Sequence, residues 1–326
     1  MPRNFLYTPP LSNNFFLPLI VFFRMLIPFC ILLFSCKQDK IAQKNYKTEN
    51  VVIVVMDGAR YSETFGDTSH AYIPHLWNSM RDSGVLFTEF YNQGTTFTVN
   101  GHVAITTGFY QEIPNDGSML PQYPSLFQHW NKKNDPSGTT SWLVCSKDKL
   151  EVLGNTKDIR YKNQYLPNSD CGVSGNGSGY RSDSITFLRA LQCLQNQKPR
   201  VLLINFMEPD YSGHTGNWNA YLNGIQKTDN YAYQLWQFLK NDPHYKGNTT
   251  FLFTNDHGRH DYDFKNHGDQ CQGCKHIFLY AEGPDFPQGK TISSPYSLVD
   301  LHATCKEMLH LWEAQSSGKV IHELFE

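Results

Sequence analysis

The sequence predicts an α/β protein with a mostly parallel central sheet sandwiched by helices. Short apolar runs alternate along the chain with longer segments of helical periodicity, which is the pattern of parallel strands joined by crossover helices. The first run, residues 51–56, is continuously apolar and β-branched, as expected of a strand buried on both faces. The composition, 40% hydrophobic and 18% charged, is that of a globular protein.

The expected elements follow in order from this first strand. A helix opens at residues 73–80, with Pro74 near its start, and Gly84 ends it. The turn-rich stretch 168–181 is expected to form a loop over one end of the sheet or a disordered excursion. Apolar periodicity predicts further strands at 85–91, 141–144, 201–206, 249–254 and 276–281, and helices at 99–107, 182–195, 218–240 and 298–312.

The N-terminus reads as a targeting segment. Residues 15–35 are almost all apolar, and the ending Leu33-Phe34-Ser35-Cys36 resembles a bacterial lipoprotein signal, cleaved before a cysteine that is then lipidated. Arg24 interrupts the run, so a start at Met25 would leave a signal-length segment; the alternative is one uncleaved N-terminal helix. Both interpretations predict an extracytoplasmic, membrane-anchored protein, periplasmic or on the cell surface. The expected organisation is a signal over 1–36, a polar tether over 37–50 and a single domain over 51–326.

Charge and cysteine content narrow the function further. The net charge of −2 indicates no nucleic-acid-binding surface. Six cysteines follow the targeting segment, an even number that favours disulfides in an oxidising compartment. For Cys271 and Cys274 a small local disulfide is favoured over a zinc pair, since a lone CxxC is weak evidence for zinc. The oligomeric state stays open.

Carboxylates and imidazoles follow three of the expected strands. Asp57 comes directly after the first strand, Asp210 and His214 follow residues 201–206, and Asp256-His257 follow residues 249–254. The carboxyl ends of parallel strands meet at one edge of a sheet, which is where such folds build their sites. Mixed Asp/His ligation suits zinc, and two ligand sets suit a two-metal centre for phosphoryl chemistry.

The order of these motifs resembles the alkaline phosphatase superfamily, most closely its type I phosphodiesterase and nucleotide pyrophosphatase branch. The resemblance covers about residues 51–312. Its pieces are Asp57-Gly58, the segment 96–108, Asp210-xxx-His214, Asp256-His257-Gly258, and His267-Gly268 upstream of residues 277–284.

The resemblance implies two zinc ions. One would be held by Asp210, His214 and a late histidine, for which the spacing to Gly283-Pro284 favours His267 over His276. The other would be held by the remaining ligands of the family pattern, which map to Asp57, Asp256, His257 and the nucleophile.

The resemblance also implies a threonine nucleophile and a phosphothreonine intermediate. The family's nucleophile lies ten residues before the glycine of a Thr-Gly pair, which maps to Thr98, at the start of the expected 99–107 helix where an anion is favoured. The residues after it, Val99-Asn100-Gly101, depart from the family's Pro-Asn, so Thr96 stays a second candidate. Asn115 resembles the asparagine that donates to a phosphoryl oxygen; Asn-Asp-Gly is also an ordinary turn signal.

The predicted function is a zinc-dependent hydrolase of small phosphoric esters, a phosphodiesterase or nucleotide pyrophosphatase. An alkaline phosphomonoesterase, a phosphoethanolamine-type transferase with the same two-metal site, and an inactive binding protein are the alternatives. Monoester specialists of the superfamily neutralise the extra phosphate charge with an arginine or a lysine-arginine pair. No motif distinguishes among the cations available for this role, which are Arg60, Lys147, Lys149, Arg160, Lys162 and Arg181.

Overall fold

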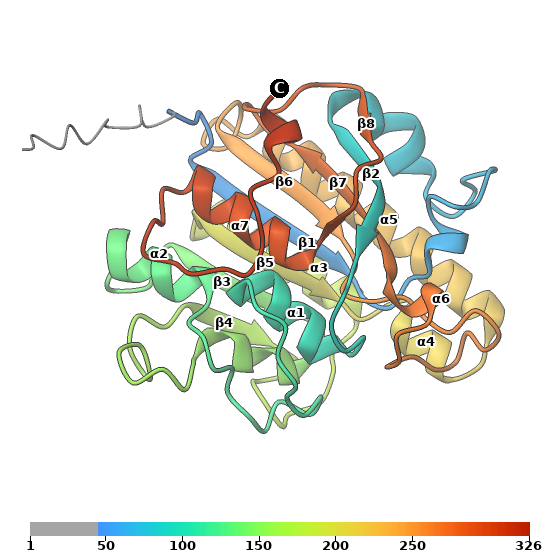
Figure 1. The fold of residues 1–326 in the computed structure, drawn as a ribbon, viewed down its shortest axis with the longest axis horizontal. Coiled ribbons are helices and arrows are strands. Elements are labelled where there is room, and N and C mark those ends of the chain that lie inside the picture. Colours follow the sequence, from blue (N-terminus) through green and yellow to red (C-terminus); the bar gives the residue numbers. More distant parts are fainter. Residues whose placement is uncertain (1–44) are drawn as a thin grey trace, which may run out of the picture. The chain divides into compact units, whose positions relative to one another are not determined.

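The computed structural model of the protein describes residues 45–326 (Figure 1). The predicted signal, the lipidation site at Cys36 and residues 37–44 of the tether lie outside the described residues. The end of the predicted tether is held against the domain, because the backbone N–H groups of Lys47 and Thr48 donate to the Asp285 carboxylate at 2.8 and 2.9 Å. Among residues 45–326, no helix is both long and apolar enough to cross a bilayer.

A nine-stranded sheet forms the centre, in the order β4-β3-β5-β1-β6-β7-β2-β8, with β9 paired to β2. It is mostly parallel, as predicted: β1 pairs in parallel with β5 and β6, and β3 with β4 and β5, whereas β7 is antiparallel to both its neighbours. The strands are β1 (Asn50–Met56), β2 (Val85–Tyr91), β3 (Ser141–Cys145), β4 (Asn168–Cys171), β5 (Val201–Phe206), β6 (Thr249–Thr254), β7 (His276–Glu282), β8 (Lys290–Ile292) and β9 (Tyr296–Ser297).

Helices cover both faces of the sheet (Figure 1). Val51, Ile53 and Val55 of β1 pack into the core under α1, α2 and α7, and the alternate residues Val52 and Val54 pack under α3 and α5. Because both faces of β1 are buried, the strand is apolar at every position. The helices are α1 (Thr98–Thr107), α2 (Leu126–Asn134), α3 (Asp183–Asn196), α4 (Asp210–His214), α5 (Trp218–Asn241), α6 (Gln272–Lys275) and α7 (Leu298–Met308).

The structure departs from the expected elements at a few places. The helix expected at 73–80 is present from Pro74, but it is irregular: a short α-helical start is followed by a π-helix at Leu76–Met80 and a 3-10 turn at Arg81–Ser83. Helix α7 ends at Met308, where His310 takes a left-handed conformation, φ 55°. The turn-rich stretch 168–181 begins with the edge strand β4, whose polar sequence Asn-Ser-Asp-Cys carries no apolar pattern. The six cysteines of residues 45–326 are all free thiols, so the expected disulfides are not formed there.

Candidate active site

The side chains predicted from the sequence meet at the carboxyl edge of the sheet. Asp57 follows β1, Asp210 follows β5 at the start of α4, and Asp256 follows β6. Gly58 allows Asp57 and Asp210 to come together: its φ is +72°, and a Cβ placed there would lie 2.7 Å from Asp210 Cβ. The Asp210 N–H donates to the Asp57 carbonyl oxygen at 3.0 Å, which ties the two strand exits.

One ligand set consists of Asp210, His214 and His267. His267 Nε2 lies 3.1 Å from His214 Nε2 and 3.3 Å from Asp210 Oδ1, and His214 Nε2 lies 3.4 Å from the same oxygen. The Nδ1 of His267 lies 2.8 Å from the Thr96 carbonyl oxygen, which can only accept, so Nδ1 carries the hydrogen and Nε2 keeps its lone pair. His276 is elsewhere, with its Nε2 2.7 Å from the Thr88 carbonyl oxygen, so the geometry favours His267.

The second set consists of Asp57, Asp256, His257 and Thr98, all buried. His257 Nε2 lies 3.6 Å from Asp57 Oδ1, 3.5 Å from Asp256 Oδ2 and 3.5 Å from Thr98 Oγ1. Its Nδ1 lies 2.8 Å from the Gly258 carbonyl oxygen, so here too Nε2 faces the set with a lone pair. Burial lowers the pKa of His257 to about 3, which keeps the ring in the neutral form that binds metals.

Thr98 opens α1, one residue earlier than the predicted helix start. Its Oγ1 lies 3.3 Å from Asp57 Oδ1, and the Val99 N–H next to it donates to Asn115 Oδ1 at 2.9 Å. Gly101 lets α1 approach the β6 exit, since a Cβ there would lie 2.5 Å from the Asp256 carbonyl oxygen. The close approach of α1 brings the Thr98 hydroxyl into the second ligand set.

Thr96 faces a different part of the molecule. Its hydroxyl donates to the Asp269 carbonyl oxygen at 2.7 Å and accepts from the Gly268 N–H at 3.1 Å. Both partners belong to the loop that carries His267. Thr96 therefore supports that loop, and the geometry favours Thr98 as the nucleophile.

Two lysines complete the site, and sequence reasoning did not single them out. Lys147, buried after β3, donates to Asp57 Oδ1, Thr98 Oγ1 and Asp210 Oδ2 at 2.9, 3.0 and 2.6 Å. Lys149 donates to Asn115 Oδ1 at 3.2 Å, and burial together with Lys147 lowers its pKa to about 8. Lys147 lies three residues after the predicted strand 141–144, closer to its strand than Asp210 is to the strand 201–206, so the rule that selected Asp57, Asp210 and Asp256 would have found it.

Arg259 is a further cation of the site. It is fully buried, and its guanidinium donates to Asp210 Oδ1 and to the carbonyl oxygens of Phe264 and Lys265. It therefore holds the loop after Asp256-His257 against a metal-ligand candidate. No sequence signal pointed to it, since this pairing depends on the path of an irregular loop.

The donor sets fit divalent ions such as zinc. Ligand atoms of Asp57, Asp256 and His257 lie within 4.8 Å of one another, as do those of Asp210, His267 and His257, and His214 adjoins the latter group. Carboxylate oxygens and imidazole nitrogens are ligand types that zinc takes. Asp256 Oδ2 is buried without a hydrogen-bond partner, which is costly unless a cation binds it. Burial and the nearby Asp256 raise the pKa of Asp57 to about 6, and a bound cation would favour the ionised carboxylate there.

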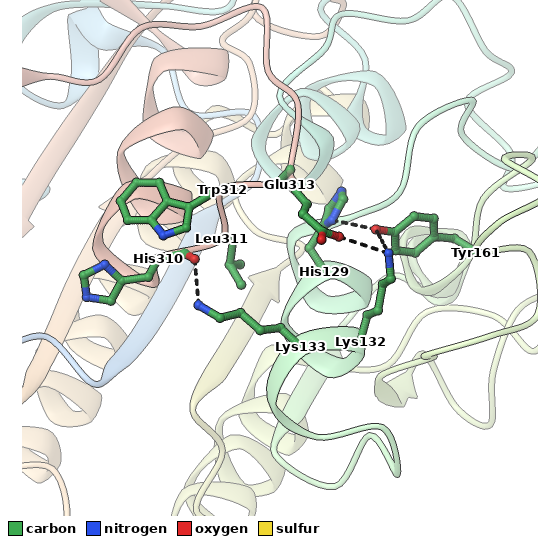
Figure 2. A pocket seen from close by; sticks show the side chains of 9 residues that line it. His129, Lys132, Lys133, Tyr161, His310, Leu311, Trp312 and Glu313 are labelled. Carbon is green, nitrogen blue, oxygen red and sulfur yellow. Dashed lines mark hydrogen bonds and ion pairs between the residues drawn. The ribbon is translucent and has the colours of Figure 1, made fainter. Parts of the chain in front are cut away.

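A separate pocket of about 250 Å³ lies between α2 and the segment after α7 (Figure 2). Lys132 and Glu313 on its wall form an ion pair of 3.0 Å, and Tyr161 Oη lies 3.1 Å from His129 Nδ1. None of the ligand-set residues, Thr98 or the two site lysines lines this pocket. The pocket is therefore lined by a different group of residues from the site at the strand exits.

Comparison with known proteins agrees with this geometry. The family model for type I phosphodiesterase/nucleotide pyrophosphatase matches residues 51–275, well over half of the chain. The chain belongs to this family. The matched range contains both ligand sets, Thr98 and the two lysines.

Solved structures of the alkaline phosphatase superfamily share the fold of this phosphodiesterase-family chain. Murine ectonucleotide pyrophosphatase/phosphodiesterase 5 has a TM-score of 0.64 at 13% identity, over 85% of this chain and 100% of that one. The phosphonate monoester hydrolase of Agrobacterium radiobacter has a TM-score of 0.61 at 14% identity, over 85% and 77%. The lipoteichoic acid synthase LtaP of Listeria monocytogenes has a TM-score of 0.59 at 10% identity, over 85% and 75%.

The chain also has a short local similarity to a further protein. A 2,3-bisphosphoglycerate-independent phosphoglycerate mutase of Gracilaria tenuistipitata var. liui is 30% identical over 82 residues. The match spans 25% of this chain and only 15% of the mutase.

Proposed function

We propose that this phosphodiesterase-family chain is a zinc-dependent hydrolase of small phosphoric esters that acts through Thr98. The observation that carries the proposal is the position of the Thr98 hydroxyl. It lies at the N-terminus of α1, within 3.5 Å of Asp57, Lys147 and His257. A threonine hydroxyl at a helix N-terminus, among carboxylates, a lysine and imidazole lone pairs, is suited to attack a bound phosphoryl group.

Asp210, His214 and His267 would hold one zinc ion, and Asp57, Asp256, His257 and Thr98 the other. When bound, the ions supply positive charge that favours the threonine alkoxide and neutralises the phosphoryl oxygens. Lys147 Nζ, 3.0 Å from Thr98 Oγ1, adds charge beside the attacking oxygen. The Asn115 oxygen is taken by the Val99 N–H and Lys149, which leaves the Asn115 amide N–H₂ to donate to the substrate.

The reaction proceeds in two displacements. Thr98 Oγ1 loses its proton and forms a bond to phosphorus while the bond from phosphorus to the ester oxygen breaks, and the leaving alcohol takes up a proton. Water then attacks the phosphothreonine, the bond from Thr98 Oγ1 to phosphorus breaks, and the phosphate product leaves with the hydroxyl restored.

One observation favours phosphomonoesters over diesters as substrates. A bound monoester is a dianion, whereas a diester carries a single charge. Lys147 and Lys149 both lie at the phosphoryl end of the site, where they meet Thr98 and Asn115 respectively. The second lysine supplies charge that a diester does not need.

The test compares hydrolysis of an aryl phosphomonoester and the matching aryl phosphodiester by the zinc-loaded full chain, with Thr98→Ala as the blank. We expect both rates to depend on Thr98 and the monoester to be preferred. A strong preference for the diester would still agree with a hydrolase, but it would reject the role proposed for Lys149. Turnover equal to that of the blank for both substrates would reject the hydrolase, and turnover only with an added acceptor alcohol would identify a transferase.

We also propose that the enzyme works outside the cytoplasm, anchored to the membrane through lipidated Cys36 or an uncleaved N-terminal helix. The apolar segment that ends at Cys36 supports this location. Cys36→Ser should release the protein from the membrane fraction if the lipid is the anchor. If the variant stays in the membrane, the anchor is the N-terminal helix and not a lipid on Cys36. Recovery of the unmodified chain in the cytosol would reject both kinds of anchor.

A further inference from the structure

A second group of metal-ligand side chains lies in the loop between β6 and β7, apart from the catalytic sets. It consists of His260, Asp269, Cys271 and Cys274, which each offer one ligand atom, and these atoms lie within 4.8 Å of one another. Cys274 is fully buried, and Cys271 is partly buried at the start of α6. The sequence showed only the two cysteines; the fold brings the histidine and the carboxylate to them.

One nitrogen of the histidine in this group makes no hydrogen bond. His260 Nε2 is buried and makes no hydrogen bond, although Asp269 Oδ2 is 3.2 Å away. A buried polar nitrogen without a partner costs free energy, and a bound cation would remove that cost. The same cation would neutralise the carboxylate and two thiolates gathered around it.

The ligand chemistry narrows the choice of ion. Two cysteines separated by two residues present both sulfur atoms from one turn, which is the spacing of half a structural zinc site. Thiolate and imidazole ligands favour zinc over the hard ions magnesium, calcium and manganese. Four protein ligands leave no open position for a substrate, so such a site is structural rather than catalytic.

We propose that Cys271, Cys274, His260 and Asp269 form a structural zinc site, distinct from the two catalytic zinc sets. This site does not depend on the proposed reaction. The zinc would stabilise the loop between β6 and β7. This loop carries both Arg259 and His267, two residues in contact with Asp210.

Backbone hydrogen bonds already bring the two ends of this loop together. The Gly258 N–H donates to the Cys274 carbonyl oxygen at 2.7 Å, and the Arg259 N–H to the Gly273 carbonyl oxygen at 3.0 Å, so the two ends of the loop already lie side by side. Asp269 comes two residues after His267. An ion bound by His260 and Asp269 would therefore fix the loop on both sides of the catalytic histidine.

The test uses metal analysis and cobalt substitution of the full chain, purified under reducing conditions. We expect about three metal ions per chain and, with cobalt, the thiolate-to-metal charge-transfer absorption that only cysteine ligands give. Cys271→Ser with Cys274→Ser should remove about one ion per chain and abolish the absorption. Cys193→Ser, a buried cysteine of α3 outside the group, should change neither.

A further pair of variants separates this site from the catalytic ones. His214→Ala should lower the metal content and keep the thiolate absorption, whereas His260→Ala should lose or shift the absorption. The wild-type spectrum alone can overturn the proposal if the cysteine variants do not fold: a folded, cobalt-loaded chain without thiolate absorption contradicts it. A Cys271–Cys274 disulfide, found by mass spectrometry in the chain as isolated from its own compartment, would also contradict it.

Discussion

Thr98 and Thr96 are separated by one residue and face different neighbours. The Thr98 hydroxyl contacts Lys147 and Asp57, whereas the Thr96 hydroxyl is bonded to residues 268 and 269. Thr98→Ala should therefore lower kcat/KM for an aryl phosphate by roughly a thousandfold or more and retain the bound zinc. The measurement is steady-state kinetics together with metal analysis.

Thr96→Ala is the matched control for this prediction. It removes a hydroxyl of the same kind from the neighbouring position, but that hydroxyl supports the 267–269 loop, so we expect a much smaller loss of kcat/KM. Equal losses in the two variants would contradict the assignment of Thr98 as the nucleophile.

Lys149 gives the site a pH dependence. Burial and the charge of Lys147 lower its pKa to about 8, so its ammonium is charged below that pH and neutral above it. Binding of inorganic phosphate, measured as competitive inhibition, should therefore weaken as the pH rises through about 8. In Lys149→Arg the charge persists to higher pH, and the weakening should disappear. Equal pH profiles for the wild type and this variant would contradict a role of Lys149 in phosphate binding.

At the scale of elements, the contact between α1 and the β6 exit builds the second ligand set. Gly101 makes it possible, because a Cβ there would meet the Asp256 carbonyl oxygen at 2.5 Å and the Asp256 Cβ at 2.9 Å. Gly101→Ala should move α1 away, lower the zinc content and activity, and cost about 1–3 kcal/mol in the free energy of unfolding. Metal analysis, kinetics and denaturant unfolding report these changes.

Gly154→Ala provides a control with the same added methyl group away from the catalytic site. The nearest atom to a Cβ at Gly154 is Pro167 Cγ, at 3.3 Å. We expect zinc content and activity to stay near those of the wild type. If Gly101→Ala also leaves both unchanged, the close approach of α1 is not needed for the site.

Strands were easier to predict from this sequence than the elements that connect them. β1 and β5 are almost wholly apolar runs buried on both faces, and β6 has the buried apolar centre Phe251–Phe253, so composition marks all three. The edge strand β4 is polar, so the sequence predicted only a loop or a disordered excursion there. Helix α2 was missed, although Ser125 and Gln128 form a capping box that is visible in the sequence as Ser-x-x-Gln.

In the candidate site, too, residues at strand exits were easier to predict than residues in connecting loops. Ligands that directly follow a strand, such as Asp57 and Asp256, could be found from position alone. His267 required the family resemblance, because it lies in an irregular loop. Arg259 gave no prediction, and for Cys271 and Cys274 the sequence predicted a local disulfide, whereas the structure has two free cysteines beside His260 and Asp269. The partners of these residues are set by how that loop folds back.

For the whole molecule, zinc removal should lower stability without unfolding the chain. The ions bind the folded state and not the unfolded one, so chelation should lower the Tm by about 5–10 °C. The stripped chain should stay folded because Lys147 and Arg259 still pair with the buried carboxylates. Differential scanning calorimetry with and without chelator measures this shift.

Variants of the ligand sets test the origin of that shift. His214→Ala removes one ligand of the first set, so chelation should lower its Tm by less than it lowers that of the wild type. An identical shift in this variant would mean that the chelator acts on other ions, and an unchanged Tm in the wild type would contradict metal stabilisation altogether.

The position of β1 has a consequence for how the protein is made. This strand leaves the ribosome first among the strands of the described residues, yet its two neighbours, β5 and β6, are completed about 150 and 200 residues later. The centre of the sheet therefore cannot form until most of the chain has been synthesised. Until then β1 has neither of its native neighbours, so a chain that is still being made lacks the central sheet and could pass through a membrane channel before this sheet forms.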